Sequence, residues 1–430
     1  MSLYFEKLNL QQSLRASIAA LAIGFVVILA ETQTAQAQTF SLIHTFTGGQ
    51  DGYRPPAGLT MDKAGNLYGV TLSNEAFELK HKNSVWVFNQ LYFFSDDGNG
   101  NYPQARVVFG PDGALYGTTA FGGSNGCSYN LGCGVVFRLR AQPTVCKTAL
   151  CPWAETVLYR FTGEPDGAYP QGEVTFDAAG NIYLTTASGG WFDCGTVVEL
   201  TPSNGIWMER LLYSFGGGQG DGCQPMSELI FDKAGNLYGT TVGGGDPSCQ
   251  DSAGCGTIFQ LTPSGSGWAE KVLWRFAKGQ PGDVHPYAGL IFDNSGILYG
   301  ATAGTAGVSQ GAAFELALPS GKLSQLYAFQ GVCCSGQGPF ASLVMDTAGN
   351  LYGATYSDGP YAAGNIFKLA PSGGEWMYTD LYDFSGTSDG LHPNGPLVLN
   401  ANGDLYGTTT DGGYPGCLPE GCGVVWEITP

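Results

Sequence analysis

Six residues that could bind a ligand stand directly before a proline that recurs along the chain. They are Arg54, Tyr102, Tyr169, Gln224, His285 and His392, and Gly338 holds the same place in one further copy. Their side chains are polar or aromatic, so aromatic faces could stack on a sugar while polar groups bond its hydroxyls. The alternative is that these are ordinary loop positions, which tolerate any polar residue. The sequence therefore predicts a ligand-binding site at these six positions.

The sequence contains none of the common catalytic motifs. It has four histidines and no H-E-x-x-H, G-x-S-x-G or Walker pattern. The glycine-rich string at 216–222 joins strand to strand, which does not favour a phosphate site. His285 and His392 stand at equivalent positions and could share a metal, but two ligands are a weak set. We predict no metal and no cofactor, and we favour a protein that is not an enzyme.

Carboxylates are the remaining candidates for catalysis or metal binding. Glu173, Glu228 and Asp283 could supply the acid and base of a glycoside hydrolase, although no spacing singles out two of them. Other aspartates recur with a D-x-x-G turn, at Asp62, Asp177, Asp232, Asp293 and Asp346, or with a DG-x-x-P loop, at Asp51, Asp166, Asp221 and Asp389. Only residues 96–101 approach the carboxylate density of a calcium loop. We therefore interpret the repeated aspartates as turn residues that bond backbone amides.

The 12 cysteines predict disulfide bonds in an exported chain. The local pairs are Cys127 with Cys133, Cys146 with Cys151, Cys249 with Cys255, and Cys417 with Cys422. Cys194 has no local partner, and Cys223 in the loop before the next repeat is the nearest candidate. Cys333 and Cys334 are adjacent and could form a vicinal disulfide. The alternative is a zinc cluster, which the placement of the pairs in hairpins disfavours.

One motif, repeated seven times, carries all of these residues. The string DKAGNLYGTT at 232–241 has six relatives, which begin at residues 62, 110, 177, 293, 346 and 400. Each copy is associated with a V-F-x-L run and an L-Y-x-F run. Repeats of roughly 40–60 residues are typical of propellers and solenoids.

Each repeat predicts four short antiparallel strands. In residues 226–276 these are SELIFD, LYGTT, GTIFQL and AEKVLWRF, and no repeat shows a long helical period. Four strands per repeat predict an all-β, seven-bladed β-propeller. The first strand of the chain, TFSLIHTF, resembles the fourth strand of a repeat, and the last, GVVWEITP, resembles the third strand. We therefore expect the N-terminal strand to complete the last blade and close the ring, with an open β-solenoid as the alternative.

The repeat unit, with its D-x-x-G-N-L-Y-G-T-T, G-x-V-F-x-L and L-Y-x-F segments, resembles the bacterial GloVer tandem-repeat family. The match covers residues 40–430. The resemblance implies an exported bacterial repeat protein, and it implies no activity and no catalytic residue. Family members often end in an anchoring segment. This chain ends at Thr429-Pro430 without one, so we expect a freely secreted or periplasmic protein.

The N-terminus has the order of a secretory signal peptide. Lys7 and Arg15 precede the apolar run at 16–30, and the small-x-small sequence of residues 35–37 follows. We predict a signal peptide at 1–37 and a single domain at 38–430. The alternative is an uncleaved anchor, but the apolar run is shorter than the about 20 residues that a membrane span needs.

The composition excludes several other classes of protein. The 430 residues carry 18 basic and 36 acidic side chains, and the net charge of −18 disfavours nucleic acid as a partner. The 67 glycines exclude a coiled coil, and the 43% hydrophobic content excludes a disordered chain. We expect a monomer that binds an extracellular glycan or protein at one mouth of the ring without catalysis. The alternatives are a carbohydrate-active hydrolase or lyase with carboxylates near the mouth, and a structural component of the envelope or matrix.

Overall fold

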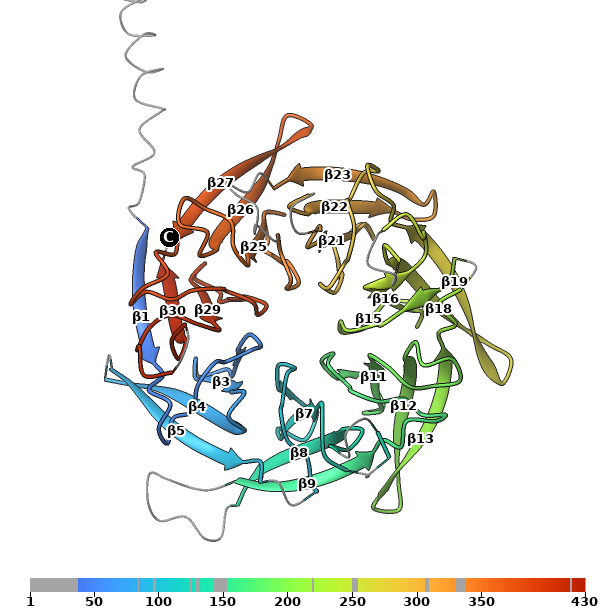
Figure 1. Ribbon diagram of the computed structural model, residues 1–430, viewed down its shortest axis with the longest axis horizontal. Helices are drawn as coiled ribbons and strands as arrows, with labels where there is room; N and C mark the ends of the chain where they lie inside the picture. Colours follow the sequence, from blue (N-terminus) through green and yellow to red (C-terminus); the bar gives the residue numbers. More distant parts are fainter. Residues whose placement is uncertain are drawn as a thin grey trace, which may run out of the picture. The chain divides into compact units, whose positions relative to one another are not determined.

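Seven four-stranded antiparallel sheets form a ring in the computed structural model of the protein (Figure 1). The structure describes residues 38–83, 85–95, 98–123, 126–127, 131–142, 153–218, 220–249, 254–305, 309–329, 338–417 and 420–429. Within these ranges there is no helix that is long and apolar enough to cross a membrane. The predicted all-β, seven-bladed propeller is confirmed. The predicted signal peptide at 1–37 lies outside the described residues.

The strands of each blade follow one another from the centre of the ring outward. Blade 1 comprises β2 (Thr60–Met61), β3 (Leu67–Val70), β4 (Glu75–Lys82) and β5 (Val85–Phe93). Blade 2 comprises β6 (Val108–Phe109), β7 (Leu115–Thr119), β8 (Val135–Ala141) and β9 (Trp153–Arg160). Blade 3 comprises β10 (Thr175–Phe176), β11 (Ile182–Thr186), β12 (Thr196–Ser203) and β13 (Ile206–Ser214). Blade 4 comprises β15 (Ile230–Phe231), β16 (Leu237–Thr241), β18 (Thr257–Ser264) and β19 (Gly267–Arg275).

The remaining blades repeat the same order. Blade 5 comprises β20 (Ile291–Phe292), β21 (Leu298–Thr302), β22 (Ala312–Ala317) and β23 (Lys322–Ala328). Blade 6 comprises β24 (Val344–Met345), β25 (Leu351–Thr355), β26 (Asn365–Ser372) and β27 (Glu375–Asp383). Blade 7 comprises β28 (Val398–Leu399), β29 (Leu405–Thr409), β30 (Val424–Thr429) and β1 (Thr39–Thr45). A separate two-stranded ladder pairs β14 (Gly222–Cys223) with β17 (Gly243–Gly244).

The ring closes through β1, as the sequence predicts. The sheet of blade 7 has the order β1-β30-β29-β28, so the first strand of the chain pairs with the last (Figure 1). The Phe46 N–H donates to the Gly423 carbonyl at 3.1 Å, and the Phe40 ring stacks on Tyr382 of blade 6 at 3.9 Å. With β1 in place, blade 7 has four strands like the other blades, and β30 is no longer at the edge of its sheet.

Inside each blade, the second strand meets the third through a matched pair of residues. In blade 4, Gly239 lies opposite Phe259, and a Cβ on Gly239 would be 2.6 Å from the Phe259 ring. The ring therefore occupies the space that the glycine leaves. Four other blades have the same glycine–phenylalanine pair, and blade 7 has glycine with Trp426. In blade 3 the larger residue of the pair lies on the second strand, because Leu184 of β11 lies opposite the smaller Val198 of β12.

The blades pack on one another through the phenylalanine that ends each L-Y-x-F run. The Phe215 ring of blade 3 lies 5.0 Å from Phe259 of blade 4, and Phe94 of blade 1 lies 4.7 Å from Phe137 of blade 2. Both rings of each pair are buried. These contacts place apolar surface on both faces of every sheet, which explains why the strands do not simply alternate between apolar and polar residues.

The repeated aspartates stabilise the turns that follow the first strands. Asp232 accepts hydrogen bonds from the Ala234 N–H at 2.8 Å, from the Asn236 N–H at 2.9 Å and from the Tyr238 hydroxyl at 3.0 Å. Burial alone would raise the pKa of Asp232, but these hydrogen bonds lower it below its ordinary value. The turn interpretation is therefore confirmed for this set. The acidic pair of the calcium-like segment, Asp96 and Asp97, lies outside the described residues.

Four of the predicted disulfide bonds are present. They join Cys127 with Cys133, Cys194 with Cys223, Cys249 with Cys255, and Cys417 with Cys422. The Cys194–Cys223 bond links the loop before β12 to the loop that leads into blade 4, so it connects two blades. Cys146, Cys151, Cys333 and Cys334 lie outside the described residues. Disulfides of this kind are typical of proteins in an oxidising compartment.

Candidate functional site

The residue before each recurring proline connects two blades through its backbone. The N–H of Gln224 donates to the Cys194 carbonyl of blade 3 at 2.9 Å, and its carbonyl accepts the Val242 N–H of blade 4 at 3.1 Å. All six predicted ligand residues have a φ between 55° and 61°. That left-handed conformation is uncommon outside glycine, and its recurrence shows that the junction between blades imposes it. These positions therefore have a structural role. Their role in ligand binding stays a prediction.

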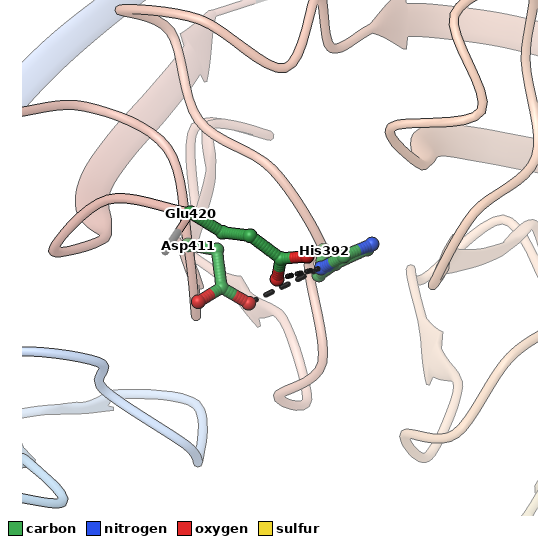
Figure 2. Close-up of side chains that lie close together, drawn as sticks. All are labelled: His392, Asp411 and Glu420. Carbon is green, nitrogen blue, oxygen red and sulfur yellow. Dashed lines mark hydrogen bonds and ion pairs between the residues drawn. The ribbon is translucent and has the colours of Figure 1, made fainter. Parts of the chain in front are cut away.

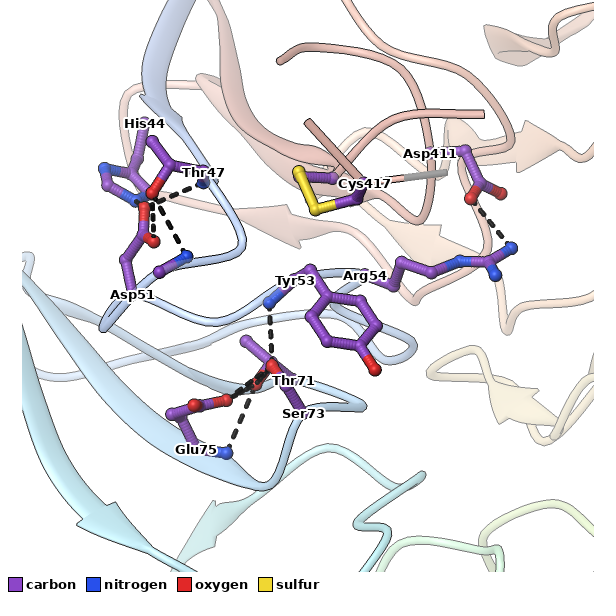
Figure 3. The surroundings of a disulfide bond; sticks show 12 residues. His44, Thr47, Asp51, Tyr53, Arg54, Thr71, Ser73, Glu75, Asp411 and Cys417 are labelled. Carbon is purple, nitrogen blue, oxygen red and sulfur yellow. Dashed lines mark hydrogen bonds and ion pairs between the residues drawn. A yellow bond between two sulfur atoms is a disulfide. The ribbon is translucent and has the colours of Figure 1, made fainter. Parts of the chain in front are cut away.

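Two of the six side chains, Arg54 and His392, converge on one buried carboxylate. The Arg54 Nη2 lies 2.8 Å from Asp411 Oδ1, and the His392 Nδ1 lies 3.1 Å from Asp411 Oδ2 (Figures 2 and 3). The Glu420 Oε2 is 4.0 Å from the same His392 nitrogen. Asp411 is fully buried. The ion pair with Arg54 supplies the positive charge that a buried carboxylate needs.

His392, Asp411 and Glu420 form the one group in the described part of the chain whose geometry could suit a metal ion. One ligand atom of each lies within 4.8 Å of the others (Figure 2). A metal bound there would share Asp411 with the Arg54 guanidinium, and the two cations would repel each other. The arrangement therefore fits an ion-pair network better than a metal centre.

The other predicted side chains are held in different ways. His285 is 6% exposed, and its two ring nitrogens lie 3.2 Å from the Gly304 and Gly254 carbonyl oxygens. Its ring is thus committed to nearby backbone and is not presented to a metal shared with His392. Tyr102 and Tyr169 flank Phe121, with ring centroids 5.5 and 5.7 Å away.

A second row of rings crosses blades 5, 6 and 7. Tyr287 lies 4.8 Å from Phe340, Phe340 lies 5.3 Å from Tyr356, and Tyr356 stacks on His392 at 4.1 Å with an interplanar angle of 1°. All four rings are half-buried. Stacked and edge-to-face contacts of this kind fix the ring orientations. The row leads from the Asp411 carboxylate to the central cavity, which Tyr287 and Phe340 line.

The centre of the ring holds a cavity of 320 Å³. Its walls include the residue after each recurring proline, namely Pro56, Gln104, Gln171, Met226, Tyr287, Phe340 and Asn394. Among the described residues, the cavity is thus lined by the residue after the proline, and the six residues before it are not part of the wall. Amide groups lie in blades 2, 3 and 7, and aromatic rings lie in blades 5 and 6.

The residue two positions further along is polar in four of the seven copies. The seven equivalent residues are Gly58, Arg106, Glu173, Glu228, Gly289, Ser342 and Pro396. Pro396 and the four polar residues, Arg106, Glu173, Glu228 and Ser342, line the cavity. We call these four residues the channel belt. The Arg106 Nη2 lies 2.7 Å from Glu173 Oε2, which joins blades 2 and 3. The Ser342 hydroxyl donates to Glu228 Oε1 at 2.5 Å, which joins blades 4 and 6.

Gly289 of blade 5 makes the second link possible. A Cβ at this position would lie 2.4 Å from the carboxyl carbon of Glu228, so a larger residue would displace the carboxylate. The Gly289 N–H also donates to the Ser342 hydroxyl at 2.9 Å. The repeat therefore leaves a gap in blade 5 through which Glu228 reaches blade 6.

Burial controls the charges of the channel belt. It raises the pKa of Glu173 to about 7, while the Arg106 guanidinium opposes and the Glu228 carboxylate reinforces that rise. Burial alone would lower the pKa of Arg106, but the Glu173 carboxylate raises it above its ordinary value. Arg106 also points one nitrogen at the Leu59 carbonyl of blade 1, 3.5 Å away. The belt thus combines a permanent cation with a carboxyl group that changes charge near neutral pH.

The raised pKa of Glu173 predicts a pH-dependent stability. An acid with a higher pKa in the folded protein binds its proton more tightly there, so it stabilises the fold at low pH. That contribution is complete below the ordinary pKa of 4.5 and is lost as the pH rises through about 7. We expect the stability of the wild type relative to Glu173→Gln to fall by ~1 kcal/mol or more over this range. Urea unfolding at several pH values measures this difference in stability, with Glu375→Gln as a matched surface control. Parallel curves for wild type and Glu173→Gln would contradict the assignment.

The sequence predicts part of this site. Glu173 and Glu228 are among the carboxylates that it offers for catalysis, and both line the cavity. The third, Asp283, accepts the Gly311 N–H at 3.1 Å and is not among the described residues that line the cavity. Sequence reasoning missed Arg106 and Ser342. Alignment of the seven copies would have found them, because they interrupt a position that is otherwise glycine, proline or glutamate.

Comparison with known protein families gives a match that spans most of the chain. A family model described as the Gloeobacter/Verrucomicrobia repeat matches residues 30–249, 130–359 and 248–430. A search of curated proteins gives no match.

A search of solved structures gives matches that include three proteins. An oxidoreductase (glucose dehydrogenase) from Thermus thermophilus has a TM-score of 0.45 and 15% identity, and the match covers 91% of this chain and 100% of that one. A 6-phosphogluconolactonase from Bacteroides uniformis has a TM-score of 0.46 and 15% identity over 86% of this chain and 89% of its own. The PQQ domain of Coprinopsis cinerea pyranose dehydrogenase has a TM-score of 0.46 and 14% identity over 92% and 96%.

Proposed function

The protein belongs to the Gloeobacter/Verrucomicrobia repeat family, and from this premise we propose that it is an exported propeller that binds the end of a glycan in its central cavity without catalysis. The observation that carries the proposal is the cavity itself, where amide, charged and aromatic side chains from several blades face one space of 320 Å³. Cavities of about 300–1,000 Å³ with a few placed polar groups are typical of small-ligand sites.

The chemistry of the wall suits a polar, uncharged ligand. The rings of Tyr287 and Phe340 offer flat apolar faces, while Gln104 and Gln171 offer both donors and acceptors for hydroxyl groups. Arg106 is paired with Glu173, so the channel belt does not present an unpaired cation to a phosphate. A recessed cavity also suits one or two sugar rings better than a protein surface, which needs a wider contact.

Export is part of the same proposal. The apolar run at 16–30, the small residues at 35–37 and the four disulfide bonds support a secreted or periplasmic protein that is cleaved after Ala37. A glycan ligand of the cell surface or the medium would be available in either place.

Replacement of Tyr287 tests the proposed binding site. Wild-type protein recovered from the medium or periplasm is screened on a glycan array, and its intact mass shows whether the chain begins at Gln38. For the glycan that binds, we expect Tyr287→Ala to weaken affinity at least about tenfold in calorimetry, because a stacking face is lost. Tyr361→Ala is the matched control, because that tyrosine is 64% exposed on another loop. Equal losses in both variants, or none in Tyr287→Ala, would contradict the proposal.

Catalysis by Glu173 and Glu228 is a second candidate function. The observation in its favour is that both carboxyl groups line one cavity and that the pKa of Glu173 is raised to about 7, as in a general acid. The ion pair with Arg106 counts against it, because it holds Glu173 away from a role as a free proton donor. Incubation of the protein with the glycan that it binds, followed by analysis of the products, shows whether the protein hydrolyses that glycan. Hydrolysis that is lost in both Glu173→Gln and Glu228→Gln would favour the enzyme over the binding protein.

A further inference from the structure

A tryptophan from one blade covers a tyrosine of the preceding blade at most junctions of the ring. Trp268 of blade 4 lies 6.3 Å from Tyr183 of blade 3, and Trp376 of blade 6 lies 5.9 Å from Tyr299 of blade 5. The ring centroids of Trp86 and Tyr406 are 6.3 Å apart, as are those of Trp153 and Tyr68. Trp207 packs in the cluster that contains Tyr116. Each of these tryptophans stands at or near the start of the outermost strand of its blade.

Blade 5 lacks this tryptophan because its outer hairpin is shorter. In blade 4 the residue pairs between β18 and β19 include Pro263 with Trp268 and end with Ser264 opposite Gly267. In blade 5 the ladder between β22 and β23 stops at Ala317 opposite Lys322. The residues that would carry the indole are therefore missing, and the turn at 318–321 begins with Leu318 and Pro319 instead. Among the described residues, no tryptophan lies over Tyr238 of blade 4 as Trp268 lies over Tyr183.

A cavity of 520 Å³ lies where the indole is missing. Its apolar wall is formed by Phe231 and Tyr238 of blade 4 and by Phe292, Leu318 and Pro319 of blade 5. Tyr238 and Phe292 keep the edge-to-face contact of 5.2 Å that the filled junctions also have. The rings are thus already in the arrangement that receives an indole elsewhere in the ring.

The rim of this cavity is polar. The two turns that border it contribute Asp232, Lys233, Asp293, Asn294 and Ser295. The cavity shares no lining residue with the central cavity. Blades 6 and 7 also meet without a tryptophan on β1, but there the Lys368 ammonium lies 5.6 Å above the Tyr352 ring. The cavity beside Tyr238 therefore combines a missing tryptophan with an open aromatic wall.

We propose that this cavity binds a free small molecule that carries one planar aromatic ring system of the size of an indole. The internal repeat supports this assignment, because the same wall accepts an indole at the other junctions. An apolar cavity lined by aromatic and aliphatic side chains takes up a ring of matching size, and its polar rim can bond the substituents of the ring. The site is separate from the glycan site and does not depend on it.

Binding of indole itself tests the proposal. We expect wild-type protein to bind one equivalent with a dissociation constant of about 1 mM or tighter, measured by calorimetry or ligand-observed NMR. Leu318→Trp should fill the cavity from within and weaken binding at least about tenfold. Ile206→Trp is the matched control, because it adds an indole at a position that is 65% exposed on another hairpin and should leave binding unchanged.

A second variant tests the proposal even if Leu318→Trp fails to fold. Trp268→Ala should open the equivalent space between blades 3 and 4, so that the protein binds two equivalents of indole. Absence of indole binding by the wild type up to the solubility limit would overturn the proposal, as would undiminished binding by folded Leu318→Trp. Failure of this site would leave the glycan proposal untouched, because Tyr287→Ala reports on the central cavity alone.

Discussion

Arg106→Met is expected to lower the free energy of unfolding by about 3 kcal/mol. The variant removes the guanidinium that lies 2.7 Å from the Glu173 carboxylate, and the Glu173 side chain is only 10% exposed. A buried carboxylate that loses its counter-charge must either stay charged at a cost or take up a proton. Urea unfolding at pH 8 measures the loss. At pH 5 the loss should be smaller, because Glu173 is then protonated and needs no partner.

Two further variants make this prediction specific. Arg140→Met removes an exposed arginine at the end of β8 and should change stability by less than about 0.5 kcal/mol. The double variant Arg106→Met with Glu173→Leu removes both charges and should recover more than half of the loss, because no uncompensated charge remains. If Arg106→Met costs no more than Arg140→Met, the channel belt is not a buried ion pair in solution.

Gly239→Leu is expected to destabilise the protein by about 3 kcal/mol, because its side chain would overlap the Phe259 ring. Phe259→Val alone should cost about 2 kcal/mol, because it leaves a cavity between the two strands. The double variant reproduces the Leu184–Val198 pair of blade 3 and should lie within about 1.5 kcal/mol of the wild type. Thermal and urea unfolding of the four proteins complete a double-mutant cycle.

The comparison with blade 3 makes this cycle decisive. Pairing between the second and third strands has the same register in both blades, so the exchange tests size complementarity and not strand alignment. Additive losses would mean that Gly239 and Phe259 do not act as a matched pair. A large coupling would confirm that the blades tolerate either arrangement of sizes, provided that the two residues change together.

The fold could be predicted closely because the same structural unit recurs in seven repeats. The turn aspartates, the tyrosine of the second strand and the strand at 39–46 that resembles the fourth strand of a repeat each have one physical interpretation in a closed ring. The Cys194–Cys223 bond was predictable for the same reason, since the two loops that carry these residues lie on one face of a propeller.

The candidate site was harder to predict because it depends on the direction of the backbone. The sequence points to Tyr169 and its equivalents, whose backbone turns with positive φ into the junction between blades. Gln171, Gly172 and Glu173 follow the proline, and all three line the cavity. The reach of Glu228 to Ser342 across Gly289 depends on side-chain geometry that no spacing in the sequence reveals.

A crystal structure of the protein with its tightest-binding glycan tests the central claim most directly. We predict that a sugar ring lies in the central cavity, against Tyr287 and within hydrogen-bonding distance of Gln104, Gln171 or the channel belt. A glycan bound elsewhere on the protein, for example at the exposed side chains of Trp191 and Phe192, with the central cavity free of sugar, would contradict it.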